Sequence, residues 1–221
     1  VTILILWFLF EVGFKAKPID NFPFILWLCA AIIPFNFLND ALQQSTNSIN
    51  EYRYLLNKVA FRISVLPIVK IISSLFIDLF FIGVLFIIFS LYGYYPTIHS
   101  VQLIYYLLSM IIFVLGLSWL TSSLVLFFKD IGQLVSVILQ IWFWYTPIFW
   151  HLNMFPAKIH FIIKINPMYY IVTGYRDSLI YKIWFWHHEK QTFYFWLIAL
   201  FFFVLGALFF KKLRPHFADV A

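Results

Sequence analysis

The sequence predicts an all-α integral membrane protein with six transmembrane helices, organised as one domain over residues 1–221. Three observations lead to this fold class. Hydrophobic residues make up 64% of the chain and charged residues 11%, against about 25% charge in soluble domains. Mean hydropathy is +0.93. Apolar runs of about the 20 residues that a membrane-spanning helix needs recur along the chain.

Five apolar runs are long enough to span a bilayer, and a sixth at the beginning of the chain is shorter. The five cover residues 24–42, 68–91, 101–128, 134–150 and 193–210. The short run, residues 1–14, starts at full hydrophobicity, so we expect the chain to begin inside a helix whose start lies before Val1. A cleaved signal peptide is the alternative, which the lack of a basic region and of a small-residue cleavage site disfavours.

The formal charge of +6 suits membrane topology and anionic lipid better than nucleic acid, because the sequence contains no basic tract. If residues 1–14 cross outward, eight basic residues fall inside and seven outside. The positive-inside rule therefore supports this orientation only through the clustering of the inside charges near helix ends. Cys29 is the single cysteine, which excludes an intramolecular disulfide.

Residues 43–67 form the most polar segment between spans. Ser48 and Glu51 have the S-x-x-E spacing of a capping box, which predicts that a short helix begins here. Apolar positions then recur at helical spacing, at Tyr52, Leu55, Leu56 and Val59. Such an amphipathic helix either lies on the lipid surface or docks into a groove of a soluble partner.

The stretch after Gln140 interrupts the regular pattern of spans. The apolar run stops at Thr146-Pro147, and two shorter, half-polar segments follow before the last span. They are too short to cross a bilayer, so we expect re-entrant or interfacial helices. Pro147 should end one helix and Pro167, after Asn166, should start another.

A few ionisable residues fall in or beside the spans, where they are costly. Asp78 lies deepest, either as a buried polar contact with Ser74 one turn earlier or in a transport role. Glu11 and Lys15 are four residues apart, which predicts a local ion pair. Four histidines lie between residues 151 and 188 without cysteine or carboxylate partners at ligand spacing, so we expect no metal site.

No G-x-x-x-x-G-K-[ST] motif occurs, so the chain has no P-loop with which to bind a nucleotide. Any energy that the protein uses must come from elsewhere. Scattered acids such as Glu11, Asp78 and Asp177 do not form a visible catalytic set. A membrane-embedded transferase acting on lipid-linked sugars is therefore a weaker hypothesis than a transporter.

Four segments together resemble the membrane subunits of ABC-2-type exporters: NEYRYLLNK with FRISVLP, FFKDIGQLV, WYTPIFW and INPMYYIVTGYRDSL. Within that superfamily the chain is most similar to the polysaccharide and polyol-phosphate exporters. The most specific element is the order Thr146-Pro147-Ile148, Asn166-Pro167, Tyr175-Arg176-Asp177. Arg62 departs from the family, which often has proline at that position. Family members also begin with an amphipathic helix, which we expect to precede Val1.

The resemblance implies a bacterial cytoplasmic-membrane permease that exports a lipid-linked glycan such as O-antigen, capsular polysaccharide or teichoic acid. An ABC-2 permease for a drug or a simple lipid is the alternative. The resemblance further implies a homodimer that carries two copies of a separate ATPase subunit. ATP and magnesium would bind to that subunit, and this chain would hold no cofactor.

The resemblance also assigns expected roles to residues. The coupling helix that docks on the ATPase is expected at Glu51, Tyr52, Leu55, Leu56 and Val59. Short exterior helices over residues 156–181 would form the gate, with gate residues Pro147, Asn166, Pro167, Tyr169, Tyr175, Arg176 and Asp177. Arg176 and Asp177 either form a charged interfacial face or contact an anionic pyrophosphate head.

A conduit for glycans needs aromatic platforms and hydrogen-bonding groups. The first and fifth spans are expected to line it, with candidates Trp7, Phe10, Trp142, Tyr145 and Phe149. The competing interpretation of the aromatic residues near the fifth span is an interfacial belt.

Overall fold

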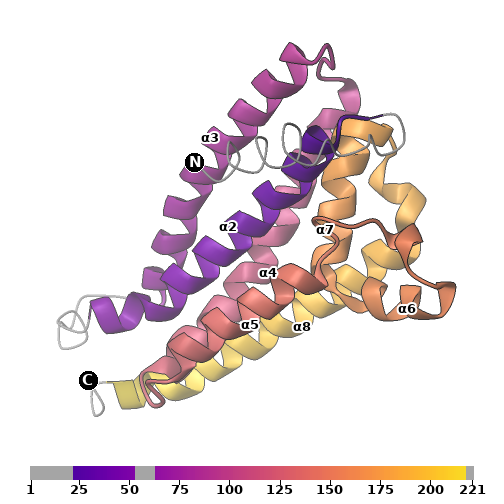
Figure 1. Ribbon diagram of the computed structural model, residues 1–221. Coiled ribbons are helices and arrows are strands. Elements are labelled where there is room, and N and C mark those ends of the chain that lie inside the picture. The colour runs from indigo at the N-terminus through magenta and orange to yellow at the C-terminus, as the bar shows by residue number, and fades with distance from the viewer. Residues whose placement is uncertain (1–21, 53–62, 218–221) are drawn as a thin grey trace.

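The computed structural model describes residues 22–52 and 63–217, and these form a helical bundle (Figure 1). The five longest helices are α2 (Phe24–Glu51), α3 (Val65–Leu91), α4 (Gln102–Val125), α5 (Ile131–Tyr145) and α8 (Glu189–Leu213). Two short helices, α6 (Ala157–Ile165) and α7 (Pro167–Arg176), lie between α5 and α8. The predicted all-α class is confirmed.

Four of the described helices are long and apolar enough to cross a membrane: α2, α3, α4 with the turn before it, and α8 with its flanking turns. The fifth predicted span is the shorter α5, with 15 residues. Residues 1–14 lie outside the described residues, so the count of six spans remains a prediction. The apolar helices make the chain a multi-pass membrane protein.

Helix α2 occupies the centre of the bundle, where it contacts α3, α4, α5 and α7. Within its most apolar window 83% of the residues are buried, compared with 28% in α3 and 22% in α8. A helix that is apolar all round is buried by protein or faces lipid. The apolar part of helix α2 is covered by the other helices, whereas α3 and α8 present most of their apolar surface outward.

The predicted capping box at Ser48 and Glu51 is wrong. Helix α2 continues without a break to Glu51, so both residues belong to its last turns. The Ser48 hydroxyl donates to the carbonyl of Ser45 at 2.6 Å, a bond that serine forms inside helices. The amides that a cap would satisfy already bond to carbonyls of the preceding helical turn. The Glu51 carboxylate forms an ion pair with the Lys70 ammonium at 2.7 Å.

Helices α4 and α8 approach closely at two glycines. A Cβ atom added to Gly206 would lie 2.1 Å from the carbonyl oxygen of Gly116. A Cβ atom at Gly116 would lie 2.5 Å from the backbone nitrogen of Phe203. Small residues let two helix backbones come this close, as in other membrane bundles. The pair fixes α8 against α4.

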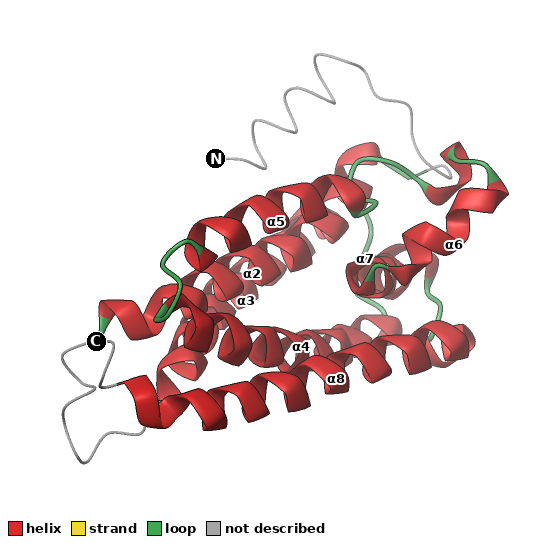
Figure 2. Ribbon diagram, turned by 90° about the horizontal axis from the view of Figure 1, so that it is seen from below, coloured by secondary structure: helices red, strands yellow, loops and turns green. Residues whose placement is uncertain are grey.

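The two ends of the bundle differ. Helices α6 and α7 gather at one end, and the C-terminal turn lies at the opposite end (Figure 2). At the opposite end, a small apolar cluster joins the end of α2, the start of α3 and the residues after α4 and α8. Its buried members are Ile49, Ile63, Leu66, Leu126, Phe210 and Phe217. The described helix ends that flank the connections predicted to lie inside thus meet at one end of the bundle. The long insertion lies at the other end, which we name the outer end.

Candidate functional site

The insertion after Gln140 folds as two short helices, with the breaks at the predicted prolines. Helix α5 ends at Tyr145, where both the amide and the hydroxyl of Thr146 bond to the carbonyl of Trp142. Pro167 is the first residue of α7, where its missing N–H costs nothing. The Asn166 side chain caps this helix by accepting a hydrogen bond from the Met168 amide at 2.9 Å.

Asn166 also joins the start of α7 to the end of α5. Its Oδ1 accepts a second hydrogen bond, from the Trp142 indole at 2.6 Å. Its Nδ2 donates to the Thr146 hydroxyl at 3.0 Å. Asn166 and Thr146 are almost fully buried. The Thr-Pro-Ile and Asn-Pro motifs, 20 residues apart in the sequence, are therefore in direct contact.

Arg176 brings the third motif to the same place. Its guanidinium donates to the carbonyl of Pro147 at 2.8 Å, of Ile148 at 3.1 Å and of Trp27 at 3.3 Å. It also lies over the Trp27 ring, 3.2 Å from the ring centre. Burial lowers the pKa of Arg176 to about 9, so the side chain remains protonated at neutral pH.

The alternative of a charged interfacial face is wrong for Arg176 and Asp177. Arg176 is 5% exposed and Asp177 is 3% exposed. The physical reason is that backbone carbonyls of the segment after α5, which have no helical partner, provide acceptors for the buried cation. We name the contacting set of Thr146, Pro147, Ile148, Asn166 and Arg176 the outer clasp.

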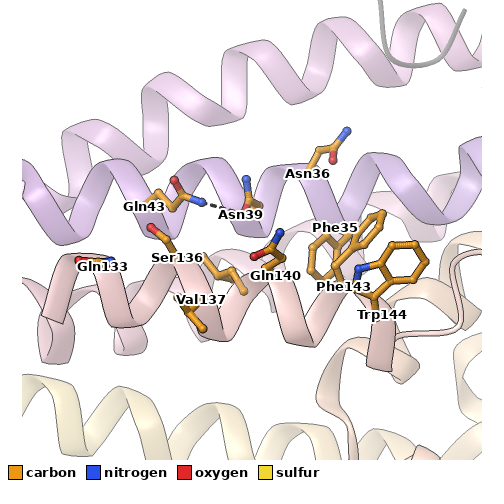
Figure 3. A pocket seen from close by; sticks show the side chains of 11 residues that line it. Phe35, Asn36, Asn39, Gln43, Gln133, Ser136, Val137, Gln140, Phe143 and Trp144 are labelled. Atoms are coloured by element: carbon orange, nitrogen blue, oxygen red, sulfur yellow. Dashed lines mark hydrogen bonds between the residues drawn. The ribbon is translucent and has the colours of Figure 1, made fainter. Parts of the chain in front are cut away.

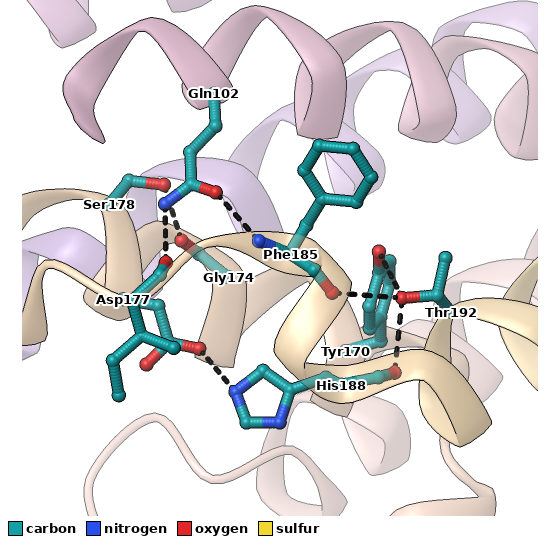
Figure 4. Close-up of polar contacts among 9 residues, drawn as sticks. Gln102, Tyr170, Gly174, Asp177, Ser178, Phe185, His188 and Thr192 are labelled. Atoms are coloured by element: carbon teal, nitrogen blue, oxygen red, sulfur yellow. Dashed lines mark hydrogen bonds and ion pairs between the residues drawn. The ribbon is translucent and has the colours of Figure 1, made fainter. Parts of the chain in front are cut away.

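Asp177 contacts a residue that the sequence pattern did not single out as its partner. Its Oδ2 lies 3.1 Å from Nε2 of His188, just before α8 (Figure 4). Nearby, Gln102 at the start of α4 donates to the carbonyl of Ile183 at 2.7 Å and accepts from the amide of Phe185 at 3.0 Å. These contacts fix the connection between α7 and α8 to the outer end of α4.

Two predicted gate tyrosines lie on α7. Tyr175 is fully buried, and its hydroxyl has no hydrogen-bond partner among the described residues. Tyr169 lines a cavity of about 110 Å³ together with Trp27, Pro147 and Arg176. Pro147, Asn166 and Arg176 belong to the outer clasp, and Tyr169 shares a cavity with two of its members. The role of the seven predicted residues as a gate remains a prediction.

The predicted conduit residues of the fifth span, two on α5 and Phe149 after it, are divided among different contacts. Trp142 bonds to Asn166, and the Tyr145 hydroxyl donates to the carbonyl of Ile162 in α6. Phe149 packs against Trp144, with ring centres 5.8 Å apart. These contacts give Trp142 and Tyr145 a part in holding the outer segment. Trp7 and Phe10 lie outside the described residues.

A polar groove between α2 and α5 is the feature that sequence reasoning missed. It has a volume of about 570 Å³ (Figure 3). Its hydrogen-bonding side chains follow one face of each helix: Asn36, Asn39 and Gln43 on α2, and Gln133, Ser136 and Gln140 on α5. Spacings of three and four residues on both helices are the signal that could have revealed it.

Aromatic side chains line the outer part of this groove. Phe35, Phe143 and Trp144 lie together at one end of the groove, past Gln140 and beside Asn36 (Figure 3). The Phe35 and Phe143 rings are 5.2 Å apart in an edge-to-face arrangement. We name this feature the α2–α5 groove. It offers amides at its inner part and aromatic faces at its outer part.

Residues 1–180 match the profile of the ABC-2 type transporter family. The chain belongs to this family. It is 26% identical to the O-antigen export system permease protein RfbA of Myxococcus xanthus, over 72% of this chain and 62% of that protein. It is 25% identical to an O-antigen export system permease protein RfbA of Klebsiella pneumoniae, over 98% of this chain and 82% of that protein.

Most of the coupling helix predicted for this ABC-2 permease lies outside the described residues, including Leu55, Leu56 and Val59. Two of its predicted residues are described. Glu51 pairs with Lys70 on α3, and the Lys70 ammonium lies 5.4 Å from the centre of the Tyr52 ring. These contacts tie the end of α2 to α3 at the inner end of the permease.

Asp78 is buried in α3 near the middle of the permease, as its position in a span predicts. The predicted contact with Ser74 is wrong, because neither Asp78 Oδ2 nor the Ser74 hydroxyl has a hydrogen-bond partner among the described residues. Both residues line a small pocket between α2 and α3.

Proposed function

We propose that this chain is the permease subunit of an ATP-driven exporter that moves a lipid-linked polysaccharide across the bacterial cytoplasmic membrane. The α2–α5 groove is the observation that carries the proposal. The two RfbA relatives, which are named as O-antigen export permeases, support the same substrate class. O-antigen is thus the first candidate, ahead of capsular polysaccharide and teichoic acid.

The groove has the chemistry that a sugar chain needs. A glycan carries hydroxyl groups at its edges and apolar C–H faces on its rings. Amide side chains both donate and accept hydrogen bonds, so they pair with hydroxyls in either direction. Aromatic rings at the outer part pack against the C–H faces. A drug or a simple lipid does not require the six hydrogen-bonding side chains that line the groove.

The outer clasp acts as the exit gate in this proposal. It lies at the end of the bundle that the groove approaches, and it joins α7 to α5 and α2 through Asn166 and Arg176. A glycan leaving the groove requires α7 to move against α5. The bonds of the outer clasp then break together, which gives the gate discrete closed and open arrangements.

The energy and the second half of the conduit come from partners. The ABC-2 family implies an ABC ATPase, and we propose two copies of it bound to a permease homodimer. ATP and magnesium bind to those ATPase subunits. The segment from Glu51 to Val59 docks on them, and Leu55 and Leu56 provide the apolar contact.

The experiment uses proteoliposomes that contain the permease and its ATPase with a radiolabelled lipid-linked glycan. Glycan should reach the far leaflet only with ATP. Asn39→Leu and Gln140→Leu should each lower the rate severalfold, since a buried hydroxyl that loses its partner costs about 1–3 kcal/mol. Asn47→Leu is the matched control, because Asn47 is an exposed amide of α2 that does not line the groove.

The outcomes separate the candidate functions. ATP-dependent movement of a simple lipid or a drug with no movement of glycan would assign the permease to the other substrate class. Glycan transport that is equally fast in the groove variants and in Asn47→Leu would remove the groove from the path. A permease that never associates with an ATPase would end the proposal.

A further inference from the structure

A second pocket, between α2 and α3, is lined by Asp78, the single carboxylate of α3. Its volume is about 170 Å³. Four oxygen-bearing side chains line it, Asn36 and Asp40 from α2 and Ser74 and Asp78 from α3. The apolar side chains of Ile33, Phe37, Ile77 and Phe81 complete its wall.

The carboxylate of Asp78 needs a partner that the described residues do not supply. Asp78 is 3% exposed and Ser74 is 2% exposed. Asp78 Oδ2 and the Ser74 hydroxyl are both buried without a hydrogen-bond partner among residues 22–52 and 63–217. A charged or polar group in the middle of a membrane span is expensive unless a counter-charge or water pairs with it. Both residues line the same pocket, and these two unpaired oxygen atoms indicate a bound ligand.

The lining restricts the chemistry of that ligand. Every polar group among the described lining residues is an oxygen acceptor or can present one, and none of these residues is cationic. Oxygen ligands select hard cations. The pocket has room for several waters beside a small ion, since about 10–15 Å³ of this volume holds one water.

The number of ligands distinguishes between the hard cations. Calcium takes about 6–8 oxygen ligands, and magnesium gives up its water reluctantly. No group of three or more His, Cys, Asp or Glu residues suited to a metal occurs among the described residues. Four oxygen-bearing side chains, together with a few waters, suit a monovalent ion that sheds water easily. We propose that the pocket binds Na⁺, held by Asp78, Asp40, Asn36 and Ser74.

A sodium ion at this place would join α2 to α3 in the middle of the membrane. It would also position Asn36, which lines the α2–α5 groove as well as the sodium pocket. Ion occupancy thereby acts on a groove residue without touching the outer clasp. The sodium site stands independently of the exported substrate.

The test measures equilibrium binding of ²²Na⁺ to the purified full-length protein in nanodiscs. The wild type should show saturable binding of one ion per chain, which unlabelled Na⁺ displaces and choline does not. Asp78→Asn should weaken binding by roughly tenfold or more, because even indirect contacts to a metal are worth 10- to 100-fold in affinity. Asp130→Asn, which changes an exposed carboxylate at the start of α5, should bind like the wild type.

Two further variants keep the test decisive if Asp78→Asn does not fold. Asp40→Asn changes an exposed side chain of the pocket, and Ser74→Ala removes a single hydroxyl. Both should weaken binding measurably. Absence of saturable binding, equal displacement by choline, or unchanged affinity in the Asp40 and Ser74 variants would each overturn the sodium site. A protonated Asp78 without a metal ion would give the first of these results.

Discussion

Arg176→Met should release the segment after α5 while leaving the bundle folded. In the wild type the guanidinium donates to the carbonyls of Pro147, Ile148 and Trp27. The carbonyl of Trp27 lies inside α2, where a helix amide also pairs with it. The other two carbonyls become unpaired, at about 1–3 kcal/mol each. Packing of the methionine offsets part of this, which leaves a loss of about 2–4 kcal/mol.

Hydrogen exchange by mass spectrometry is the assay, because it reports local opening. A loss of about 2–4 kcal/mol should accelerate exchange at residues 148–150 by roughly 30-fold to 1,000-fold. Arg176→Lys should fall between the variant and the wild type, since an ammonium lacks the planar fork of donors. Lys164→Met, which removes an exposed cation from the neighbouring α6, is the control and should change little. An exchange rate at residues 148–150 that is the same in Arg176→Met and in Lys164→Met would refute the role of Arg176 in holding the outer clasp.

Three other predictions concern different parts of the permease. Gly206→Ala should lower stability by about 1–3 kcal/mol in thermal unfolding, because its Cβ would collide with the backbone of α4, whereas Gly83→Ala, with open space around it, should not. Asn166→Ala should cost about 2–3 kcal/mol through the lost cap and the unpaired Trp142 indole, and Asn153→Ala should cost almost nothing. Leu55→Asp should leave membrane insertion intact but abolish co-purification with the ATPase; retained association would favour the lipid-surface helix.

The breaks in the outer segment could be predicted from the sequence because their causes are local. Proline ends or starts a helix through its own ring and its missing N–H, whatever surrounds it. The end of α5 before Pro147 and the start of α7 at Pro167 follow from this. The capping box failed for a related reason, since the spacing of Ser48 and Glu51 also occurs inside a continuing helix.

The contacts that build the site could not be predicted in the same way. Arg176 bonds to Trp27, 149 residues earlier in the chain, and no local pattern specifies such a pair. A charged residue beside a short interfacial helix suggests an exposed face, and only the tertiary fold provides the buried carbonyls that reverse this expectation. The α2–α5 groove was missed because its polar side chains come from two separate helices, each of which also carries an apolar run.

The most direct test of the α2–α5 groove as the glycan path is site-specific photocrosslinking during transport. A photoreactive amino acid replaces Gln140 in the groove or, as the control, Phe201 on the exposed face of α8. In the presence of the ATPase and ATP, the radiolabelled glycan should attach to the Gln140 position and not to the Phe201 position. Equal labelling at the two positions, or labelling at Phe201 alone, would contradict the proposed path.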